Sequence, residues 1–185
     1  MLNSENPVPD RTPMTAPVTS MNPPTLRWPP AADEPRPVTI ESFVLIGRPA
    51  DKVFEFVTNA SLWTHWHPAT ESVVAPPRPL KPGEQMMESI RAGRRRFSAT
   101  WTVLACEPPA LWVIASSPPE GDARIVYELR ADGDALTRFF RTLSYRARRW
   151  PWTMFDANLT RSVLTRQSER ALANLKRVLE GGKLG

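Results

Sequence analysis

Hydrophobic and polar residues change their spacing along the chain, and each spacing predicts a different kind of element. Residues 38–46 are rich in β-branched side chains, which predicts a strand. Apolar residues then recur at helical spacing, so we expect a short amphipathic helix over residues 49–58. A second short helix is expected over residues 60–67, because Pro68 closes the segment that follows Asn59. One strand followed by two short helices therefore opens the predicted fold.

The pattern changes after the two helices, where runs of strand-forming residues are separated by proline and glycine turns. Asp132-Gly133 is the strongest hairpin signal among these turns. The six runs cover residues 70–75, 84–91, 95–106, 110–117, 122–130 and 135–146. Together with the first strand they predict a seven-stranded antiparallel sheet built from local hairpins.

Residues 154–180 contain neither proline nor glycine and precede Gly181, which predicts one long C-terminal helix with an apolar stripe. A sheet with one apolar face has to bury that face, and this helix is the largest element available to cover it. We therefore expect an α+β fold in which a strongly curved sheet wraps around the long helix. A ligand pocket would form in the space between them.

Proline divides the 185-residue chain into two parts. Ten of the 21 prolines lie in residues 1–37, a segment with little apolar periodicity, so we expect a disordered, proline-rich tail there. Residues 38–182 form the expected ligand-binding domain. The tail carries a net charge of −1 and the whole chain +5, which leaves +6 on the remainder. The positive charge therefore belongs to the folded domain.

The composition excludes several classes of protein. A single cysteine excludes an internal disulfide framework and a cysteine-rich zinc site, and two histidines are too few for a histidine-rich metal centre. No apolar run approaches the roughly 20 residues of a membrane span, and the N-terminus lacks the apolar core of a secretory signal. We expect a cytoplasmic protein with no metal and no cofactor.

Five short stretches, taken in their order along the chain, resemble a known family. They are Ile46–Phe54, Trp66-His67-Pro68, Pro82-Gly83, Glu107-Pro108-Pro109 and Ala171–Glu180. In residue type and spacing they resemble the START-type superfamily, which has the helix-grip fold, in its polyketide cyclase/dehydrase-like branch. The resemblance covers residues 38–180.

This resemblance implies a hydrophobic cavity between the sheet and the C-terminal helix. Members of the superfamily bind or carry lipids, quinones, sterols or polyketides, and a minority are aromatase/cyclases. The superfamily has no universal catalytic residue, so the resemblance assigns no catalytic residue to this chain.

Nine residues are candidates for lining such a cavity. Strand alternation places Trp101, Tyr127 and Phe139 at inward positions, and the first two combine an apolar ring face with a polar group. One of the neighbours Met86 and Met87 should face inward, and Met87 is the predicted lining residue. The full set is Trp66, His67, Met87, Trp101, Tyr127, Phe139, Arg141, Leu159 and Val163. Plain core packing remains an alternative for these positions.

Arg141 is the candidate with the most specific chemistry. It shares a strand face with Phe139 if alternation holds, and an inward arginine needs an anionic partner because an unpaired buried charge is costly. That partner is Glu88, Glu128 or a ligand carboxylate. The alternative is an outward Arg141 on a strand whose other face is buried.

The two histidines do not predict a metal site. His65 and His67 are two positions apart, so they do not face each other on a helix. We expect Trp66 to pack in the core, with His67 at the end of the helix or at the cavity mouth. A general acid or base role for His67 is the less favoured hypothesis.

Basic residues gather beside tryptophans near the end of the sheet. Residues 138–149 contain five arginines and no acidic residue. Arg148, Arg149, Trp150 and Trp152 suit an anionic membrane surface. A solvated basic face is the plain alternative, and nucleic acid is the least favoured partner.

Three functions remain compatible with the sequence. The first is binding or transport of a hydrophobic small molecule, such as a lipid, a quinone or a polyketide-like compound. The second is a cofactor-free aromatase/cyclase or lyase that uses the same cavity, with Tyr127, Glu88, His67 or Arg141 handling protons. The third is a structural or interaction protein whose cavity is filled by side chains. A binding protein is favoured over an enzyme.

Overall fold

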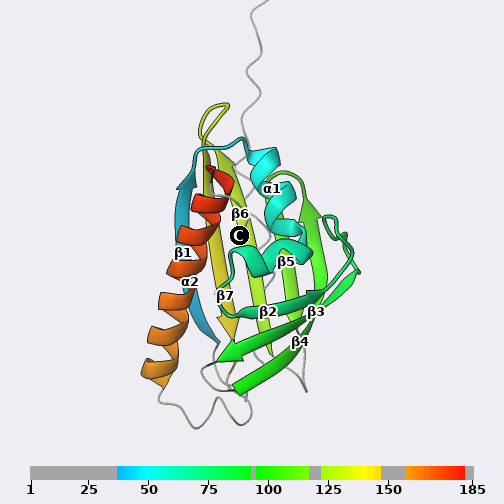
Figure 1. Ribbon diagram of the computed structural model, residues 1–185, viewed down its shortest axis with the longest axis vertical. Coiled ribbons are helices and arrows are strands. Elements are labelled where there is room, and N and C mark those ends of the chain that lie inside the picture. The colour runs from blue at the N-terminus through cyan, green and yellow to red at the C-terminus, as the bar shows by residue number, and fades with distance from the viewer. Residues whose placement is uncertain (1–36, 93–94, 117–121, 147–156, 182–185) are drawn as a thin grey trace, which may run out of the picture. The chain divides into compact units, whose positions relative to one another are not determined.

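Seven antiparallel strands form one curved sheet in the order β1-β7-β6-β5-β4-β3-β2 in the computed structural model (Figure 1). The structure describes residues 37–92, 95–116, 122–146 and 157–181. The strands are β1 (Val38–Ile46), β2 (Thr70–Val74), β3 (Gln85–Ala92), β4 (Arg95–Glu107), β5 (Leu111–Ser116), β6 (Ala123–Ala131) and β7 (Thr137–Tyr145). The helices are α1 (Ala50–Thr58), the 3₁₀ helix η1 (Ala60–His65) and α2 (Ala157–Leu179). The predicted α+β helix-grip architecture is confirmed.

Local hairpins build the sheet, and one long-range pairing completes it. Each strand from β2 to β6 pairs with the next strand along the chain, and β1 pairs with β7. The predicted turn at Asp132 joins β6 to β7, where the Asp132 backbone N–H donates to the carbonyl of Leu136 at 2.8 Å. Gly133 lies in this connection with φ of 84°, a conformation that glycine adopts without steric cost.

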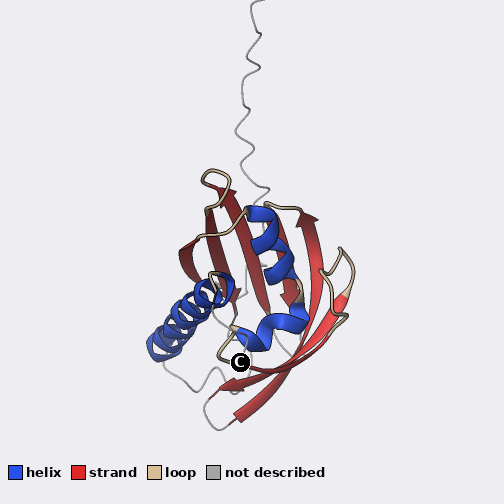
Figure 2. Ribbon diagram, turned by 45° about the horizontal axis from the view of Figure 1, so that its top comes forward, coloured by secondary structure: helices blue, strands red, loops and turns tan. Residues whose placement is uncertain are grey.

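The helices lie on the concave side of the sheet (Figure 2). Helix α1 buries Val53, Phe54 and Val57 on its inner face, as its amphipathic spacing requires. The 3₁₀ helix η1 follows directly and buries Trp63. These two short helices, rather than α2 alone, therefore cover the middle of the sheet.

An aromatic cluster fills the space between η1 and the sheet. The Trp63 ring packs edge-on against Trp112 of β5 at a centroid distance of 6.2 Å. Trp112 stacks on Tyr127 of β6 at 5.4 Å, and Tyr127 meets Phe139 of β7 at 5.1 Å. The Trp63 indole also donates to the Val57 carbonyl at 3.0 Å. The inner face is thus bridged by contacting rings across three strands.

Helix α2 is held mainly by its C-terminal half, which lies beside β1 (Figure 1). Its buried apolar residues in the described part of the helix are Ala171, Leu172 and Leu175. Two polar contacts fasten the same end: Lys176 Nζ donates to the Leu45 carbonyl at 2.6 Å, and Glu180 Oε1 accepts from the Gly47 backbone N–H at 2.6 Å. Within the described ranges, no helix combines the length and apolarity needed to cross a membrane.

We predict that Trp112→Ala lowers the free energy of unfolding by about 3–5 kcal/mol, because it removes the central ring of the aromatic cluster and leaves a cavity. Leu104→Ala is the matched control, since Leu104 lies on the adjacent β4 and is 46% exposed. It should change stability by no more than about 0.5 kcal/mol. Urea denaturation measures both. Similar small losses in the two variants would contradict a filled aromatic interior.

Candidate functional site

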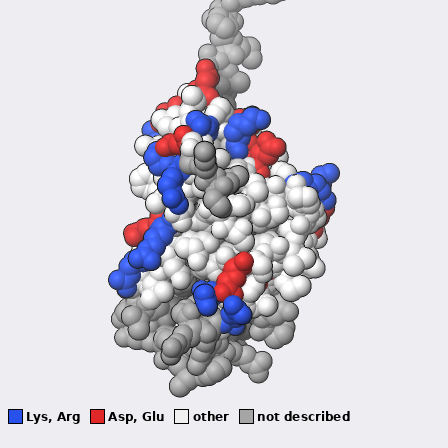
Figure 3. Space-filling view, in the orientation of Figure 1, with Lys and Arg blue, Asp and Glu red and all other residues white. Residues whose placement is uncertain are grey.

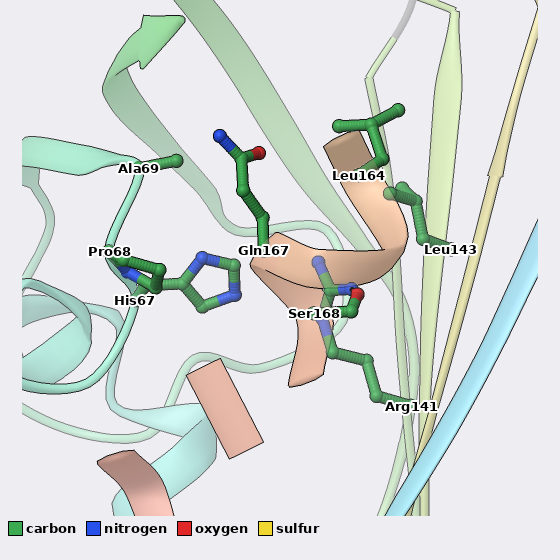
Figure 4. A pocket seen from close by; sticks show the side chains of 8 residues that line it. All are labelled: His67, Pro68, Ala69, Arg141, Leu143, Leu164, Gln167 and Ser168. Atoms are coloured by element: carbon green, nitrogen blue, oxygen red, sulfur yellow. Dashed lines mark hydrogen bonds between the residues drawn. The ribbon is translucent and has the colours of Figure 1, made fainter. Parts of the chain in front are cut away.

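A small cavity lies where the segment after η1, the inner face of β7 and helix α2 meet (Figure 4). Its volume is about 40 Å³. It is lined by His67, Pro68, Ala69, Arg141, Leu143, Leu164, Gln167 and Ser168. A cavity of this size holds on the order of three water molecules, so in this conformation it accommodates a polar head group and not a whole lipid or polyketide.

Arg141 lies at the base of this cavity because strand alternation on β7 turns it inward beside Phe139. The arginine is only 4% exposed. Its Nη1 donates to the Ser168 hydroxyl of α2 at 2.6 Å, while its Nε is buried with no hydrogen-bond partner among the described residues. The predicted inward orientation is confirmed, and the partner that the structure shows is a helix hydroxyl rather than Glu88 or Glu128.

His67 reaches the cavity from the loop that follows η1 and points toward Ser168 and the Arg141 guanidinium (Figure 4). The imidazole stacks on Trp63 at 5.6 Å and meets the edge of Trp66 at 4.6 Å. Burial, and secondarily the charge of Arg141, hold the pKa of His67 well below its ordinary value of 6.5. His67 is therefore a neutral imidazole at physiological pH, and its Nε2 is buried without a partner.

Two aromatic residues behind the cavity also carry buried polar atoms. The Tyr127 hydroxyl and the Trp66 indole nitrogen have no hydrogen-bond partner in the described structure. Burial raises the pKa of Tyr127 far above its ordinary range, and the nearby Arg141 guanidinium opposes that shift. Tyr127 is thus a neutral phenol whose proton is available for a hydrogen bond.

Glu88 is a buried carboxyl group whose hydrogen-bonding capacity is partly used by neighbours. It accepts from the Thr70 hydroxyl at 2.5 Å and from the Trp101 indole at 2.8 Å. Burial raises the pKa of Glu88, and the two hydrogen bonds and the field of Arg141 act in the opposite direction. Glu88 is thereby held on the inner face, within electrostatic reach of Arg141.

The arrangement is suited to binding and orienting a polar group. Two residues that line the cavity, His67 and Arg141, each carry a buried polar atom with no partner among the described residues. Trp66, which packs against both His67 and Tyr127, and Tyr127 itself each carry another. Within the described ranges, no group of three or more His, Cys, Asp or Glu residues is arranged to hold a metal ion. The side chains at the cavity can supply hydrogen bonding, charge stabilisation and proton exchange.

The structure places six of the nine predicted lining residues in the interior, in one connected region. Trp66, Trp101, Tyr127, Phe139 and Arg141 are buried, and His67 is half-buried and lines the cavity. The Leu159 side chain falls outside the described structure, as do Arg148, Arg149, Trp150 and Trp152 of the proposed membrane surface.

The prediction for Met87 is wrong, because this side chain is 50% exposed on the outer face and Met86 is buried instead. Met86 pairs directly with Trp101 of β4. Residues directly opposite in an antiparallel sheet share a face, so the inward Trp101 also turns Met86 inward. The one-residue choice between two methionines depends on this register.

The prediction for Val163 is also wrong, because it is 42% exposed. Helix α2 faces the interior through Leu164 and Ser168, which line the cavity at i and i+4 spacing. Val163 is rotated away from that face by one residue. The apolar stripe in the sequence includes both Val163 and Leu164, so it does not decide which of the two faces the cavity.

Sequence reasoning missed Ser168 and Gln167, which bring the polar groups of α2 to the cavity. No signal in the sequence identifies them, because polar residues on an amphipathic helix are typical of its solvent-facing side. Only the rotation of α2 about its axis, fixed by packing against β1, places Ser168 over Arg141.

Comparisons with known proteins agree with this architecture. The START superfamily protein from Mycobacterium smegmatis superposes with a TM-score of 0.64 at 11% identity, covering 77% of this chain and 97% of that one. The Zhui aromatase/cyclase from Streptomyces sp. R1128 superposes with a TM-score of 0.63 at 16% identity, covering 78% and 94%. These similarities show a shared fold.

A third solved structure is similar over one part of its length. The di-domain ARO/CYC protein BexL from the BE-7585A biosynthetic pathway superposes with a TM-score of 0.58 at 22% identity. The alignment covers 77% of this chain but only 46% of BexL, so the present chain spans less than half of that protein. No curated protein matches this chain significantly.

The sequence itself matches one family over nearly the whole described region. That family is described as polyketide cyclase/dehydrase and lipid transport, and the match extends over residues 37–180. The matched segment includes every strand, both short helices and α2, and therefore the whole cavity. The chain belongs to the polyketide cyclase/dehydrase and lipid transport family.

Proposed function

We propose that this protein binds a hydrophobic small molecule with a polar end, in the space between the inner face of the sheet and α2. The polar end occupies the cavity beside His67 and Arg141, and the apolar part lies under α2. The role is that of a binding or transport protein. The observation that carries this proposal is that two residues lining one small cavity, His67 and Arg141, each have a buried polar atom without a partner among the described residues.

Buried polar atoms without a partner are unusual in a protein interior. The large majority of buried polar side-chain atoms have a hydrogen-bond partner, because an unsatisfied one carries a substantial desolvation cost. Among the described residues, the buried atoms of His67, Tyr127 and Arg141 lack one, and they come from the loop after η1, from β6 and from β7. A ligand that supplies the missing partners would recover this cost, which supports a binding site.

Access for the apolar part requires movement of α2, since the cavity is smaller than any lipid. The fastening of α2 supports this, because Lys176 and Glu180 hold its C-terminal half whereas Val163 in its N-terminal half is exposed. Figure 3 shows a broad uncharged area on the face that carries the helices, between charged groups in its upper part and a small cluster of acidic and basic groups below its centre. An apolar molecule can approach this surface without stripping water from ions.

An aromatase/cyclase is the second candidate, and the location of the proton-handling groups favours it. Glu88, His67, Tyr127 and Arg141, the four groups considered for proton transfer, are coupled electrostatically in one buried region. Two of the structural relatives are named as aromatase/cyclases. Incubation with a poly-β-keto thioester separates the two roles. A binding protein leaves the thioester unconverted beyond the uncatalysed rate, whereas an enzyme forms cyclised product over many turnovers.

We predict that the protein, purified from its own host, carries an apolar molecule detectable by native mass spectrometry and organic extraction. Ala69→Phe should lose this molecule, because a phenyl group at Ala69 fills the lined cavity. Ala131→Phe is the matched control, since Ala131 is exposed at the far end of β6. It should retain the molecule.

A single result would refute this binding proposal. If the protein is recovered without a bound molecule, and its melting temperature does not shift with any member of a lipid and quinone panel, the interior is a filled core. Attention would then return to an interaction role. If Ala69→Phe and Ala131→Phe both lose the bound molecule, the cavity is not where the molecule binds.

We also predict a pH-dependent stability that belongs to His67. Because its folded-state pKa lies below the ordinary value of 6.5, protonation favours the unfolded chain. The stabilisation is complete above that value and is lost as the pH falls, at up to about 1.4 kcal/mol per pH unit. His67→Gln should lack this component, whereas His65→Gln, at an exposed position on η1, should retain it.

Urea unfolding of ligand-free protein between neutral and mildly acidic pH measures the effect. The quantity compared is the slope of the unfolding free energy against pH in each variant, so contributions from Glu88 and other groups cancel. Parallel slopes for the wild type and His67→Gln would mean that the imidazole is solvated and can be charged in the folded state.

A further inference from the structure

Arg141 is a buried cation that forms no direct ion pair with any of the described residues. It is 4% exposed, and among the residues that the structure describes its guanidinium forms one hydrogen bond of normal geometry, to the neutral hydroxyl of Ser168. A guanidinium has five N–H donors, and the buried Nε is left without an acceptor. A buried charge is normally retained only with a counter-ion and satisfied donors.

Glu88 and Glu128, the two acidic residues predicted as partners of Arg141, contact other side chains. Glu88 is held by Thr70 and Trp101 and acts on Arg141 only at longer range. Glu128 pairs with Arg130, a predominantly exposed arginine. Neither therefore supplies the carboxylate oxygen atoms that the Arg141 guanidinium lacks.

The groups around the open side of the guanidinium are neutral and able to donate hydrogen bonds. The Tyr127 hydroxyl keeps its proton, and the His67 imidazole is uncharged. Both lie close enough to Arg141 for its charge to lower their pKa values. Each has a buried polar atom without a partner among the described residues. A cation flanked by neutral donors forms a site for an oxygen anion, because each of these groups can donate a hydrogen bond to the same anionic oxygen atoms.

The size and lining of the cavity restrict the anion. Its volume of about 40 Å³ suits a compact head group, and Leu143 and Leu164 form apolar walls beside the polar base. The planar guanidinium matches the two oxygens of a carboxylate better than a single hydroxyl or ketone. An apolar body attached to that head group would continue toward α2.

On this basis, and resting on the proposed function, we infer that the ligand is an amphiphilic carboxylic acid whose carboxylate is anchored by Arg141, with the His67 imidazole and the Tyr127 hydroxyl as further hydrogen-bond partners. The acid binds in its ionised form. Its apolar part determines how far α2 must move, and its head group determines where the molecule sits.

The test compares acids with neutral amides of the same shape. The probes are lauric acid with lauramide, and anthracenecarboxylic acid with its carboxamide, titrated at neutral pH by calorimetry. In the wild-type protein at least one acid should bind about tenfold or more tightly than its amide, because it makes a charge-assisted bidentate contact. In Arg141→Gln that preference should disappear.

Arg138→Gln is the matched control. Arg138 lies on the same strand, but it is exposed and pairs with Asp132. This variant should keep the preference for the acid. Loss of the preference in both arginine variants would assign it to the overall positive charge of the protein and overturn the inference.

The remaining outcomes separate this inference from the proposed function. Amides that bind as tightly as the acids overturn the anionic head group while leaving a hydrophobic binding site in place. Failure of all four probes, in a protein also isolated without a bound molecule, overturns both. If Arg141→Gln does not fold, the comparison in the wild type still decides, and Arg141→Lys, which keeps the charge without the planar fork, should retain only part of the preference.

Discussion

The packing of η1 against the sheet is the interaction on which the rest of the structure depends. A strongly curved sheet exposes a wide apolar face, and a single long helix at one side cannot cover it. The rings of Trp63, Trp112 and Tyr127 fill this width, and the Trp63 indole is tied to the end of α1 through the Val57 carbonyl. The short helices thereby fix the depth of the interior, and a small cavity remains beside α2.

That remaining space is polar at its base and apolar at its walls, and the pleat of one strand explains why. Phe139 and Arg141 are successive inward positions of β7, so they lie about 7 Å apart on the same face. Phe139 completes the aromatic cluster at one position. Arg141 begins the polar site at the next, where Ser168 of α2 meets it. Two successive inward positions of one strand thus serve core packing, at Phe139, and the proposed binding site, at Arg141.

The sequence predicted the fold well because each element depends on a local pattern. Period-two alternation identified β6 and β7 and turned Tyr127 and Arg141 inward, and a proline-free run identified α2. The errors arose where a choice depends on contacts distant in sequence. The pairing of Met86 with Trp101 decided which methionine faces inward, and the rotation of α2 against β1 decided that Ser168, not Val163, faces the cavity.

An arginine is tolerated in this aromatic interior because its charge is partly compensated. The guanidinium is partly compensated by Ser168 and by the field of the buried Glu88 carboxyl, neither of which is a full ion pair. Such incomplete compensation makes the site less stable than an apolar core of equal volume. Under the proposed function it also supplies selectivity, because a neutral apolar molecule gains only from burial under α2, whereas one with an acceptor group also satisfies Arg141. Discrimination among hydrophobic ligands then rests on what the aromatic packing leaves unsatisfied.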